Sequence, residues 1–496
     1  MKSIILSLPI FCIIASCNNS DISKLANQEE LSVTTQQEVS TDTGNDSEIS
    51  EDCPESSHCT PNNQEIFVLD SFEKPKHASR DLWKTSLSRT IFKDASTFFI
   101  VKGNLCLLVG EAQRLEPILI EHPSANEYPS DVYYDAITDL TMENCNKTLY
   151  AILDIKESYI KNGLNIEIKH LPISAPTTPT IPLFIQLEPY AFNIGVNRGS
   201  YVENHKGALS ALELLHDHRI QPIKSWISSN SPIDKDPLSF MNYVGKFKNG
   251  PTNIPEGRSA NLYAKYSSRP WFYVVDEPEE ALADQIQNKL NELKIGHPSV
   301  RRMITTSNRY PVRGIDIYCP VMEQLDNREE YSGEVWSYVS CMSHGCGENR
   351  AYLDDPKVFT TESHSRSGAP DLTIDAPSSD IFAFFLIGRH LNLGALLYYD
   401  SITQWSLISK GINIYKDMYN FGGNGDGTIL YPDFKRKRAF PSLRLKLLRE
   451  ASLLADAAKL GNYGLSSYIF STTSWYISPN IRDEIYSHLK YKLKDL

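Results

Sequence analysis

The stretch "WFYVVDEPEE" (Trp271–Glu280) is an apolar run that stops at two adjacent carboxylates, Asp276 and Glu277, with Pro278 directly behind them. The run predicts a buried strand. Neighbouring residues of a regular strand point to opposite faces, so both acids can reach one pocket only where the backbone leaves the ladder. Pro278 ends the pairing and restricts the backbone of Glu277. The stretch therefore predicts a strand end that presents two acids together.

A second interpretation of the same residues is a helix cap. Asp276 stands three residues before Glu279, ahead of an amphipathic run, which is the pattern of an N-cap with a capping box. In that arrangement Asp276 accepts from backbone N–H groups and Glu279 reaches back. The two interpretations can hold in part together, because a cap and a pocket share the same strand end.

Strand-like and helix-like runs alternate on both sides of this stretch. Amphipathic runs at 208–218 and 279–294 fall between apolar segments. Eight such segments predict a (β/α)8 TIM barrel over residues 181–460. A doubly wound open sheet is the competing arrangement, but no Gly-rich phosphate turn follows the first strand. The eight expected strands are 183–189, 220–226, 260–266, 271–278, 301–307, 314–320, 334–341 and 393–400.

The segments outside the expected barrel have simpler patterns. Residues 65–171 hold short apolar runs separated by Gly, Asn, Pro and Lys, which predicts a small β-sandwich. The proline-rich "PISAPTTPTIP" (172–182) follows as a stiff linker. Residues 17–64 are polar, acidic and free of aromatics, which is typical of a disordered tether. Residues 461–496 form a C-terminal extension, and their role is open.

The N-terminus "MKSIILSLPIFCIIASC" (Met1–Cys17) has the layout of a secretory signal and is too short to span a bilayer. The ending "IASC" resembles the lipobox of bacterial lipoproteins, in which the peptide (1–16) is removed and Cys17 is acylated. The alternative is an ordinary signal peptide with a chance Cys. Asn18 rather than Asp after the Cys favours the outer membrane. We expect an exported lipoprotein, anchored by lipid on the periplasmic or cell-surface face.

Charge and cysteine content narrow the possible partners. The formal net charge is −12, and no basic stripe suits a phosphate backbone, which argues against nucleic acid. An exported chain can form disulfides, and Cys53 with Cys59 and Cys341 with Cys346 are plausible short bridges. Neither C-x-x-C nor zinc spacing occurs, so we expect no metal.

Other candidate site residues lie in the last part of predicted strands or shortly after them. Aromatic rings offer a flat apolar platform for a sugar and polar edges for its hydroxyls. Some aromatics at period two are instead expected to fill a barrel interior. His344 and Arg309 are weaker candidates, and Cys319 is most simply a core residue. The expected ligand contacts are Trp336, Tyr338, Tyr398, Tyr399, Trp405 and Asn308, with Asp400 beside the tyrosines.

Five motifs in order make a specific resemblance. They are "HRIQP", "FYVVDEP", "VWSYVSC", "GALLYYD" and "GNGDGTILYP...PSLRLKLLRE", spread over about residues 149–450. Together they resemble the catalytic domain of glycoside hydrolase family 123. That resemblance implies a β-sandwich ahead of a (β/α)8 barrel and β-N-acetylgalactosaminidase activity on a glycan.

The resemblance also implies a role for each acid. Adjacent carboxylates suit a scheme in which the substrate's own 2-acetamido oxygen attacks C1 and forms an oxazolinium ion. Glu277 would be the general acid and later the base, and Asp276 would orient the acetamido group. Two acids this close should not both ionise easily, so we expect a raised pKa for Glu277. The scheme needs no cofactor.

Two alternatives to this function stay open. The helix run "LREASLLADAAKL" (448–460) departs from the acidic and aromatic run that the family commonly carries there. The chain could therefore be a non-catalytic surface carbohydrate-binding lipoprotein, or a glycosidase of another sugar specificity.

Overall fold

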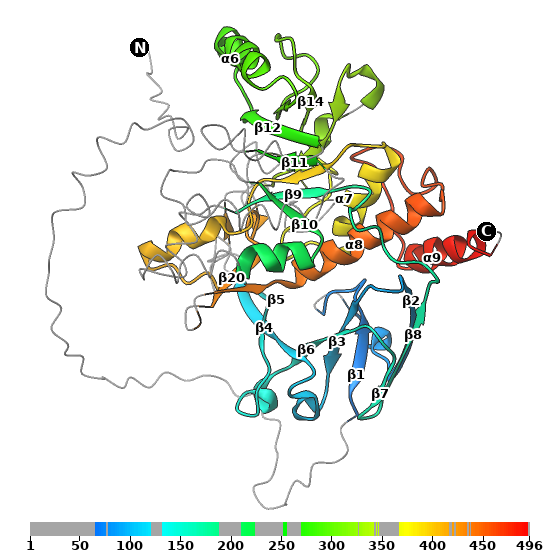
Figure 1. Ribbon diagram of the computed structural model, residues 1–496. Helices are drawn as coiled ribbons and strands as arrows, with labels where there is room; N and C mark the ends of the chain where they lie inside the picture. The colour runs from blue at the N-terminus through cyan, green and yellow to red at the C-terminus, as the bar shows by residue number, and fades with distance from the viewer. Residues whose placement is uncertain are drawn as a thin grey trace, which may run out of the picture. The chain divides into compact units, whose positions relative to one another are not determined.

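The computed structural model describes residues 65–75, 78–120, 131–187, 210–223, 251–254, 269–325, 327–341, 344, 346, 367–415, 419–420, 423–433, 436 and 438–494 (Figure 1). Residues 63–496 form one compact unit. Within the described ranges, no helix is both long and apolar enough to cross a membrane. The expected signal, tether and Cys17 lie outside the described residues.

Residues 65–171, here called the N-terminal module, form two β-sheets. A five-stranded antiparallel sheet has the order β1-β3-β6-β4-β5, and a three-stranded sheet has the order β2-β8-β7. Val68 and Phe99 from the first sheet share an apolar core with Ile166 from the second, so the sheets pack face to face. The strands are β1 (Phe67–Asp70), β2 (Ser86–Ile91), β3 (Thr97–Lys102), β4 (Gln113–Ile120), β5 (Asp131–Asp139), β6 (Tyr150–Ile155), β7 (Tyr159–Lys161) and β8 (Leu164–His170), with short 3-10 helices η3 (Arg80–Leu82), η4 (Leu105–Leu108) and η5 (Cys145–Lys147).

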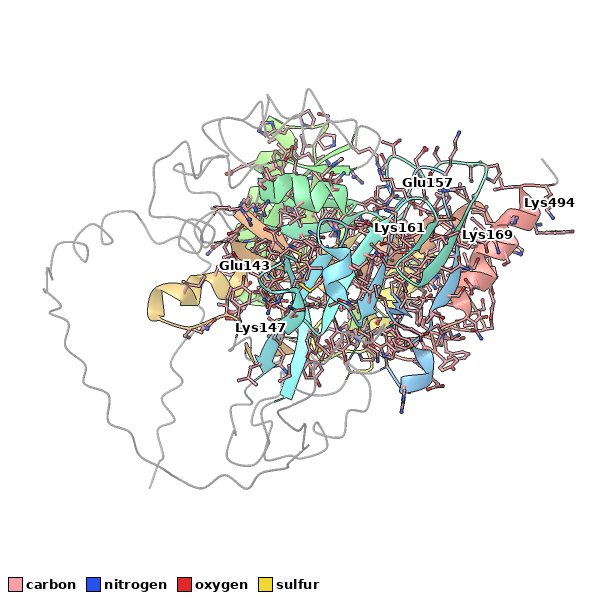
Figure 2. The ribbon with its side chains drawn as sticks, turned by 90° about the horizontal axis from the view of Figure 1, so that it is seen from below. Glu143, Lys147, Glu157, Lys161, Lys169 and Lys494 are labelled. Carbon is pink, nitrogen blue, oxygen red and sulfur yellow. A yellow bond between two sulfur atoms is a disulfide. The ribbon has the colours of Figure 1, made fainter. Side chains whose placement is uncertain are left out.

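Charged side chains of this module lie mainly at its surface. Figure 2 labels Lys161 on β7 and Lys169 on β8. Lys161 pairs with Glu111 and Lys169 with Glu167, and all four side chains are well exposed. Such surface pairs contribute little to stability.

The rest of the chain is built on two parallel sheets. Their strand orders are β10-β9-β17-β16 and β11-β12-β13-β14-β15. Every pairing within them is parallel. The strands are β9 (Leu183–Gln186), β10 (Ile220–Ile223), β11 (Pro251–Asn253), β12 (Arg269–Val275), β13 (Arg301–Ile304), β14 (Ile317–Tyr318), β15 (Glu334–Val335), β16 (Ser337–Val339) and β17 (Leu396–Tyr398).

Trp336 joins the two parallel sheets. It lies between β15 and β16, and its backbone N–H donates to the Tyr318 carbonyl (2.8 Å). The ladders therefore continue in chain order from β11 to β17 and return through β9 to β10. This order has no reversal, so the doubly wound alternative with its switch point is wrong. No ladder links β10 to β11 within the described ranges, and a closed barrel is therefore not demonstrated.

Most of the expected strands coincide with observed ones. The exception is the third, because the run 260–266 lies outside the described residues. β11 holds the third place instead, pairing with β12. Its three residues, Pro251–Asn253, include a proline and carry no apolar pattern, which is why the sequence did not reveal it.

Helices flank the parallel strands as the amphipathic runs predict. A helix at 210–217 precedes β10, and the run 279–294 becomes η7 (Glu280–Leu282) and α6 (Ala283–Gly296). The remaining elements are α7 (Ser378–His390), α8 (Leu443–Leu460), α9 (Ile481–Lys492), η8 (Met322–Gln324), η9 (Arg328–Glu330), η12 (Thr403–Lys410), and the hairpins β18 (Tyr419–Asn420) with β19 (Gly423–Asn424) and β20 (Leu430–Asp433) with β21 (Arg438–Pro441).

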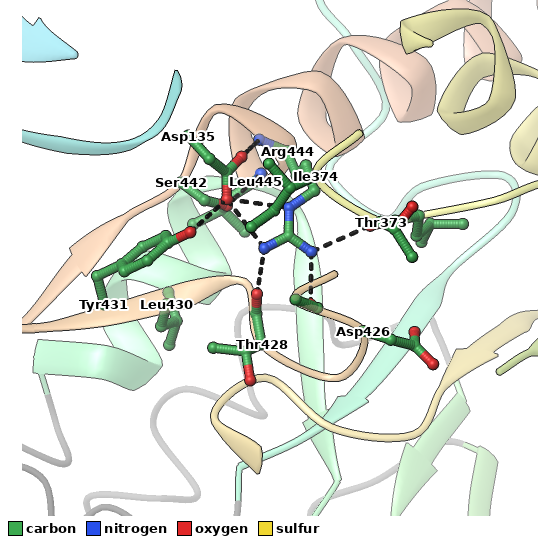
Figure 3. Close-up of polar contacts among 12 residues, drawn as sticks. Asp135, Thr373, Ile374, Asp426, Thr428, Leu430, Tyr431, Ser442, Arg444 and Leu445 are labelled. Atoms are coloured by element: carbon green, nitrogen blue, oxygen red, sulfur yellow. Dashed lines mark hydrogen bonds and ion pairs between the residues drawn. The ribbon is translucent and has the colours of Figure 1, made fainter. Parts of the chain in front are cut away.

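Helix α8 carries buried charges into the N-terminal module. Arg444 Nε and Nη2 donate to Asp135 Oδ2 on β5 (3.0 and 2.9 Å), and both side chains are only 1% exposed. Tyr431 donates to the same oxygen, and Arg444 Nη1 donates to the carbonyls of Gly425 and Leu372 (Figure 3). Burial acts to lower the pKa of Arg444, but the Asp135 carboxylate raises it above the usual range.

A second buried cluster repeats this arrangement one turn further along α8. Asp154 on β6 accepts from Lys446 (2.7 Å) and Arg449 (3.1 Å). Burial acts to raise the pKa of Asp154, but the two cations lower it below its ordinary range. The N-terminal module and α8 are thus joined by charges that each need a partner from the other.

Two disulfides are present among the described cysteines. Cys341–Cys346 confirms one expected bridge. Cys106–Cys145, with a sequence separation of 39, was not expected. The other expected pair, Cys53 and Cys59, lies outside the described residues. Cys319 is buried in the core, as predicted, and it is a free thiol.

Candidate active site

The backbone at the end of β12 is irregular, and this irregularity places the two acids. The register against β13 shifts between Tyr273 and Val275. Glu277 has a φ of 38°, in the left-handed region that non-glycine residues seldom adopt. Backbone strain of this kind is common where side chains are aimed at a functional pocket. Here Asp276 points to the end of β13 and Glu277 to the end of β16.

Asp276 is held by two hydroxyl groups. Its Oδ1 accepts hydrogen bonds from the Tyr273 hydroxyl and from Thr305 Oγ1 (2.8 Å). Thr305, directly after β13, also accepts the Glu277 backbone N–H (2.7 Å), so one threonine fixes both acids. Asp276 Oδ2 has no hydrogen-bond partner in the part of the chain that the structure describes.

The interpretation of Asp276 as a helix cap is wrong. The first helical turn, η7, begins at Glu280 with Glu279 as its N-cap, and α6 has Leu282 as its N-cap. Neither cap is closed by a side-chain hydrogen bond. The Asp276 carboxylate is engaged by Tyr273 and Thr305, away from the helix N–H groups.

Glu277 is held through its other neighbours. Its Oε1 accepts from the Tyr338 hydroxyl and lies 2.7 Å from His344 Nε2. About a third of its side chain is exposed (35%). Its Oε2 makes no hydrogen bond to any described residue. Each acid therefore has one oxygen anchored and one oxygen open.

The two acids have opposite pKa shifts. Burial, with the nearby charge of Glu277, raises the pKa of Asp276 above its ordinary value. Burial also acts to raise the pKa of Glu277, but the hydrogen bonds from His344 and Tyr338 lower it overall. The prediction of a raised pKa for Glu277 is therefore wrong for the free protein. Sequence spacing did not show that a histidine faces this carboxylate.

Trp336 does not reach the acid pair. It is fully buried, stacks on Phe184 with ring centroids 5.0 Å apart, and meets Trp271 edge-on at 4.8 Å. Two residues further along the same strand, Tyr338 contacts Glu277. Of these two expected ligand contacts, Trp336 fills the interior between the strands and Tyr338 lies beside the acids.

The aromatics at the end of β17 and after it are also directed elsewhere. Tyr398 is fully buried and donates to Asp426 Oδ1 (2.8 Å). Tyr399 packs against Gly427, where a Cβ atom would overlap its hydroxyl. Trp405 is fully buried and donates to the Leu430 carbonyl (2.9 Å). These rings support the 423–430 segment, so the structure does not present them as a sugar platform.

The remaining polar candidates around β17 and β13 serve local structure. Asp400 Oδ1 accepts the backbone N–H groups of Ser401 and Ile402, which shapes the turn after β17. Asn308 Nδ2 is 3.5 Å from the carbonyl of Glu330 at the end of η9, a weak hydrogen bond. Arg309 is exposed. None of these contacts touches the acid pair.

Metal-binding potential is limited within the described residues. The one close group of possible ligands is Cys341, Cys346 and Asp371. Both thiols are consumed by the disulfide, so this group has no thiolate to offer.

The sequence analysis missed Tyr273, Thr305 and Glu323. Thr305 could have been found, because it lies near the end of the predicted strand 301–307, where barrel sites gather. Tyr273 looked like part of a buried apolar run. Glu323 lies in η8, a short 3-10 helix that no periodic sequence pattern predicts. Its Oε1 is 3.8 Å from His344 Nδ1.

Comparison with known proteins gives a likeness in fold. No protein-family model matches the chain, and no curated protein matches it. The chain is similar to the solved structure of a family 123 glycoside hydrolase from Clostridium perfringens, studied for glycolipid glycan hydrolysis, with a TM-score of 0.52 and 10% sequence identity. The match covers 87% of this chain and 98% of that one.

Proposed function

We propose that the protein is a retaining glycosidase that releases terminal N-acetylhexosamine, with β-N-acetylgalactosamine as the preferred sugar, by substrate-assisted catalysis. One observation carries the proposal: Asp276 and Glu277 are adjacent, each has one carboxylate oxygen anchored, and each has the other oxygen open. A conventional retaining pair would need its carboxyl groups on opposite sides of the anomeric carbon.

The fold supports this proposal. Its likeness to a glycoside hydrolase of family 123 agrees with the five motifs in the sequence. We further propose that the parallel strands close into a (β/α)8 barrel, since their ladders follow chain order and β15 with β16 acts as one strand. In such barrels the reacting groups lie at the carboxyl ends of the strands, where β12, β13 and β16 bring the two acids, Thr305 and Tyr338 together.

In the first step the substrate supplies the nucleophile. Asp276 Oδ2 accepts the N–H of the 2-acetamido group, and the acetamido oxygen attacks C1. The bond from C1 to the leaving oxygen breaks as Glu277 Oε2 gives that oxygen a proton. The negative charge of Asp276 balances the oxazolinium ion.

In the second step Glu277 is the base. It takes a proton from water as the water oxygen bonds to C1 and the acetamido oxygen leaves, so two inversions retain the configuration. Glu277 is ionised in the free protein at neutral pH, and its lowered pKa favours that state further. It must therefore take up a proton before it can act as the acid of the first step. Its ionised form is the one that acts as the base of the second step.

The first experiment compares matched substrates. Nitrophenyl β-N-acetylgalactosaminide should be cleaved, the glucosaminide more slowly, and the β-galactoside without the acetamido group not at all. Asp276→Asn should lower kcat/KM on the acetamido substrate by roughly 10²-fold or more, since the ion loses its counter-charge. Asp284→Asn, an exposed acid in the first turn of α6, is the control and should keep activity.

Two results would redirect the proposal. Cleavage of the galactoside alone would exclude the acetamido mechanism and leave a glycosidase of another specificity. A sugar-dependent rise in melting temperature without product would favour the carbohydrate-binding alternative.

We also propose that the protein is exported and anchored in the outer membrane through acyl chains on Cys17. The support is the lipobox-like "IASC" at the end of an apolar run. Stable anchoring needs more than one acyl chain, which modification of a lipobox cysteine supplies. In a bacterial host, labelled palmitate should be incorporated into the wild-type chain but not into Cys17→Ala. Equal labelling of both chains would show that Cys17 is not the site of acylation.

A further inference from the structure

We infer that His344 is the positioning residue of Glu277: it holds one carboxylate oxygen in place from a disulfide-closed loop, and its charge sets how much of Glu277 is ionised. This inference deepens the proposed function, because it concerns the group to which that function assigns proton transfer. Four observations on His344 carry it.

The first is convergence on a single oxygen. His344 Nε2 lies 2.7 Å from Glu277 Oε1, and the Tyr338 hydroxyl donates to the same atom. The tyrosine hydroxyl and His344 Nε2 are themselves 3.3 Å apart. With both donors on Oε1, the carboxyl group cannot turn freely, and Oε2 is the atom left to exchange a proton.

The second observation is the carboxylate on the far side of the ring. Glu323 Oε1 lies 3.8 Å from His344 Nδ1, too far for a hydrogen bond but close enough for charge attraction. This places a proton on Nδ1 and leaves the Nε2 proton to Glu277. The imidazole is thus flanked by a carboxylate on each side, a setting that favours the doubly protonated ring.

The third is the set of titratable groups that the described residues place around the ring. Glu277, Glu323 and the more distant Asp276 favour its positive charge, while burial opposes it. Among the described residues Tyr338 is also a titratable neighbour, and burial raises the pKa of its hydroxyl well above the ordinary value, so it stays neutral. The carboxylates prevail, and the pKa of His344 is raised.

The fourth is the way the loop is held. His344 donates its backbone N–H to the Ser340 carbonyl (2.9 Å), and the disulfide Cys341–Cys346 closes the loop around it. The histidine side chain is only 20% exposed. On an unrestrained loop, the contact between the His344 ring and Glu277 would cost conformational entropy. The disulfide reduces this entropy cost, because it already restricts the loop.

Nuclear magnetic resonance of the full chain tests the inference without any enzyme assay. With ring-labelled histidine, the resonance missing from His344→Gln identifies His344. Its pKa should lie above the ordinary value of about 6.5 and should fall in Glu277→Gln, where the carboxylate is gone. An ordinary or lowered pKa that Glu277→Gln does not move would overturn the inference, whatever the activity of the protein.

Kinetics give a second readout. His344→Gln removes the positive charge, so the pKa of Glu277 should rise, and the limb of the pH–rate profile set by Glu277 should move up by on the order of one pH unit. The limb should move to higher pH whether it reports Glu277 acting as the acid or as the base. A histidine with only a structural role would lower the rate at every pH and leave the limb where it is.

The disulfide has its own matched control. Replacing Cys341 and Cys346 by Ser should bring the His344 pKa back toward the ordinary value, because the ring no longer stays at Glu277. Replacing Cys106 and Cys145 by Ser removes the other bridge and should leave that pKa unchanged. A His344 pKa that is the same in both variants would overturn the part assigned to the loop.

Discussion

Glu277→Gln is expected to lower kcat/KM about 10²–10⁴-fold on a glycoside whose leaving group is a sugar or an alkoxide, the usual size of a lost general acid. The amide keeps the shape of the side chain and can still accept from Tyr338 and His344, but it has no proton to give. On a nitrophenyl glycoside, whose leaving group departs without a proton, kcat/KM should fall far less. The turnover number should still fall there, because water attack lacks its base.

Glu280→Gln is the matched control for this variant. Glu280 lies three residues away in η7 and is exposed. Its substitution should leave both kinetic constants close to wild type. If Glu277→Gln lost activity equally on good and poor leaving groups, a role in proton donation would be excluded. Wild-type rates on both would remove Glu277 from the mechanism.

The largest loss of stability is expected from Arg444→Met. The change leaves the Asp135 carboxylate 1% exposed with no cation, and it takes donors away from the Gly425 and Leu372 carbonyls. Removing one partner of a buried pair typically costs about 3–5 kcal/mol of unfolding free energy. Denaturant-induced unfolding, followed by fluorescence, measures the difference from wild type.

Arg436→Met gives the comparison. Arg436 pairs with Asp139 on the same strand β5, but it is half exposed, so its loss should cost less than about 1 kcal/mol. Adding Asp135→Leu to Arg444→Met should recover part of the loss, since no unpaired charge stays buried. Equal effects of the two arginine substitutions would show that the Arg444 cluster contributes no more than a surface pair.

The strand order was largely predictable, because buried parallel strands have apolar sequences that end at polar or proline residues. β12 and β17 follow this rule and could be placed from sequence. β11 could not, since Pro251–Asn253 gains its strand conformation from pairing with β12 and not from its own side chains. At Pro251–Asn253 the local sequence pattern does not predict a strand, but the pairing with β12 makes one.

The acid pair itself was predictable, but its electrostatics were not. The strand-end rule places Asp276 and Glu277 together with Tyr338. Burial raises the pKa of Asp276, whereas the hydrogen bonds from His344 and Tyr338 lower the pKa of Glu277. The contact between Glu277 and His344 spans 67 residues of sequence. No spacing rule connects two loops at that distance.

Aromatic residues at alternating positions posed a different difficulty. Trp336 and Tyr338 point to the same side of one strand, so periodicity cannot separate them. Depth along the strand does: Trp336 meets Phe184 and Trp271 inside, while Tyr338 lies at the end beside Glu277. A prediction that counted residues from the strand end would have chosen Tyr338 alone.

The charge clusters between α8 and the N-terminal module bear on the ancestry of the chain. Asp135 and Asp154 are encoded roughly 300 residues ahead of Arg444 and Arg449, yet each needs its partner. A recombination event that exchanged the N-terminal module for an unrelated one would leave Arg444 and Arg449 buried without the carboxylates of Asp135 and Asp154. The module is therefore not a detachable accessory that gene shuffling could replace, and the two halves must descend together.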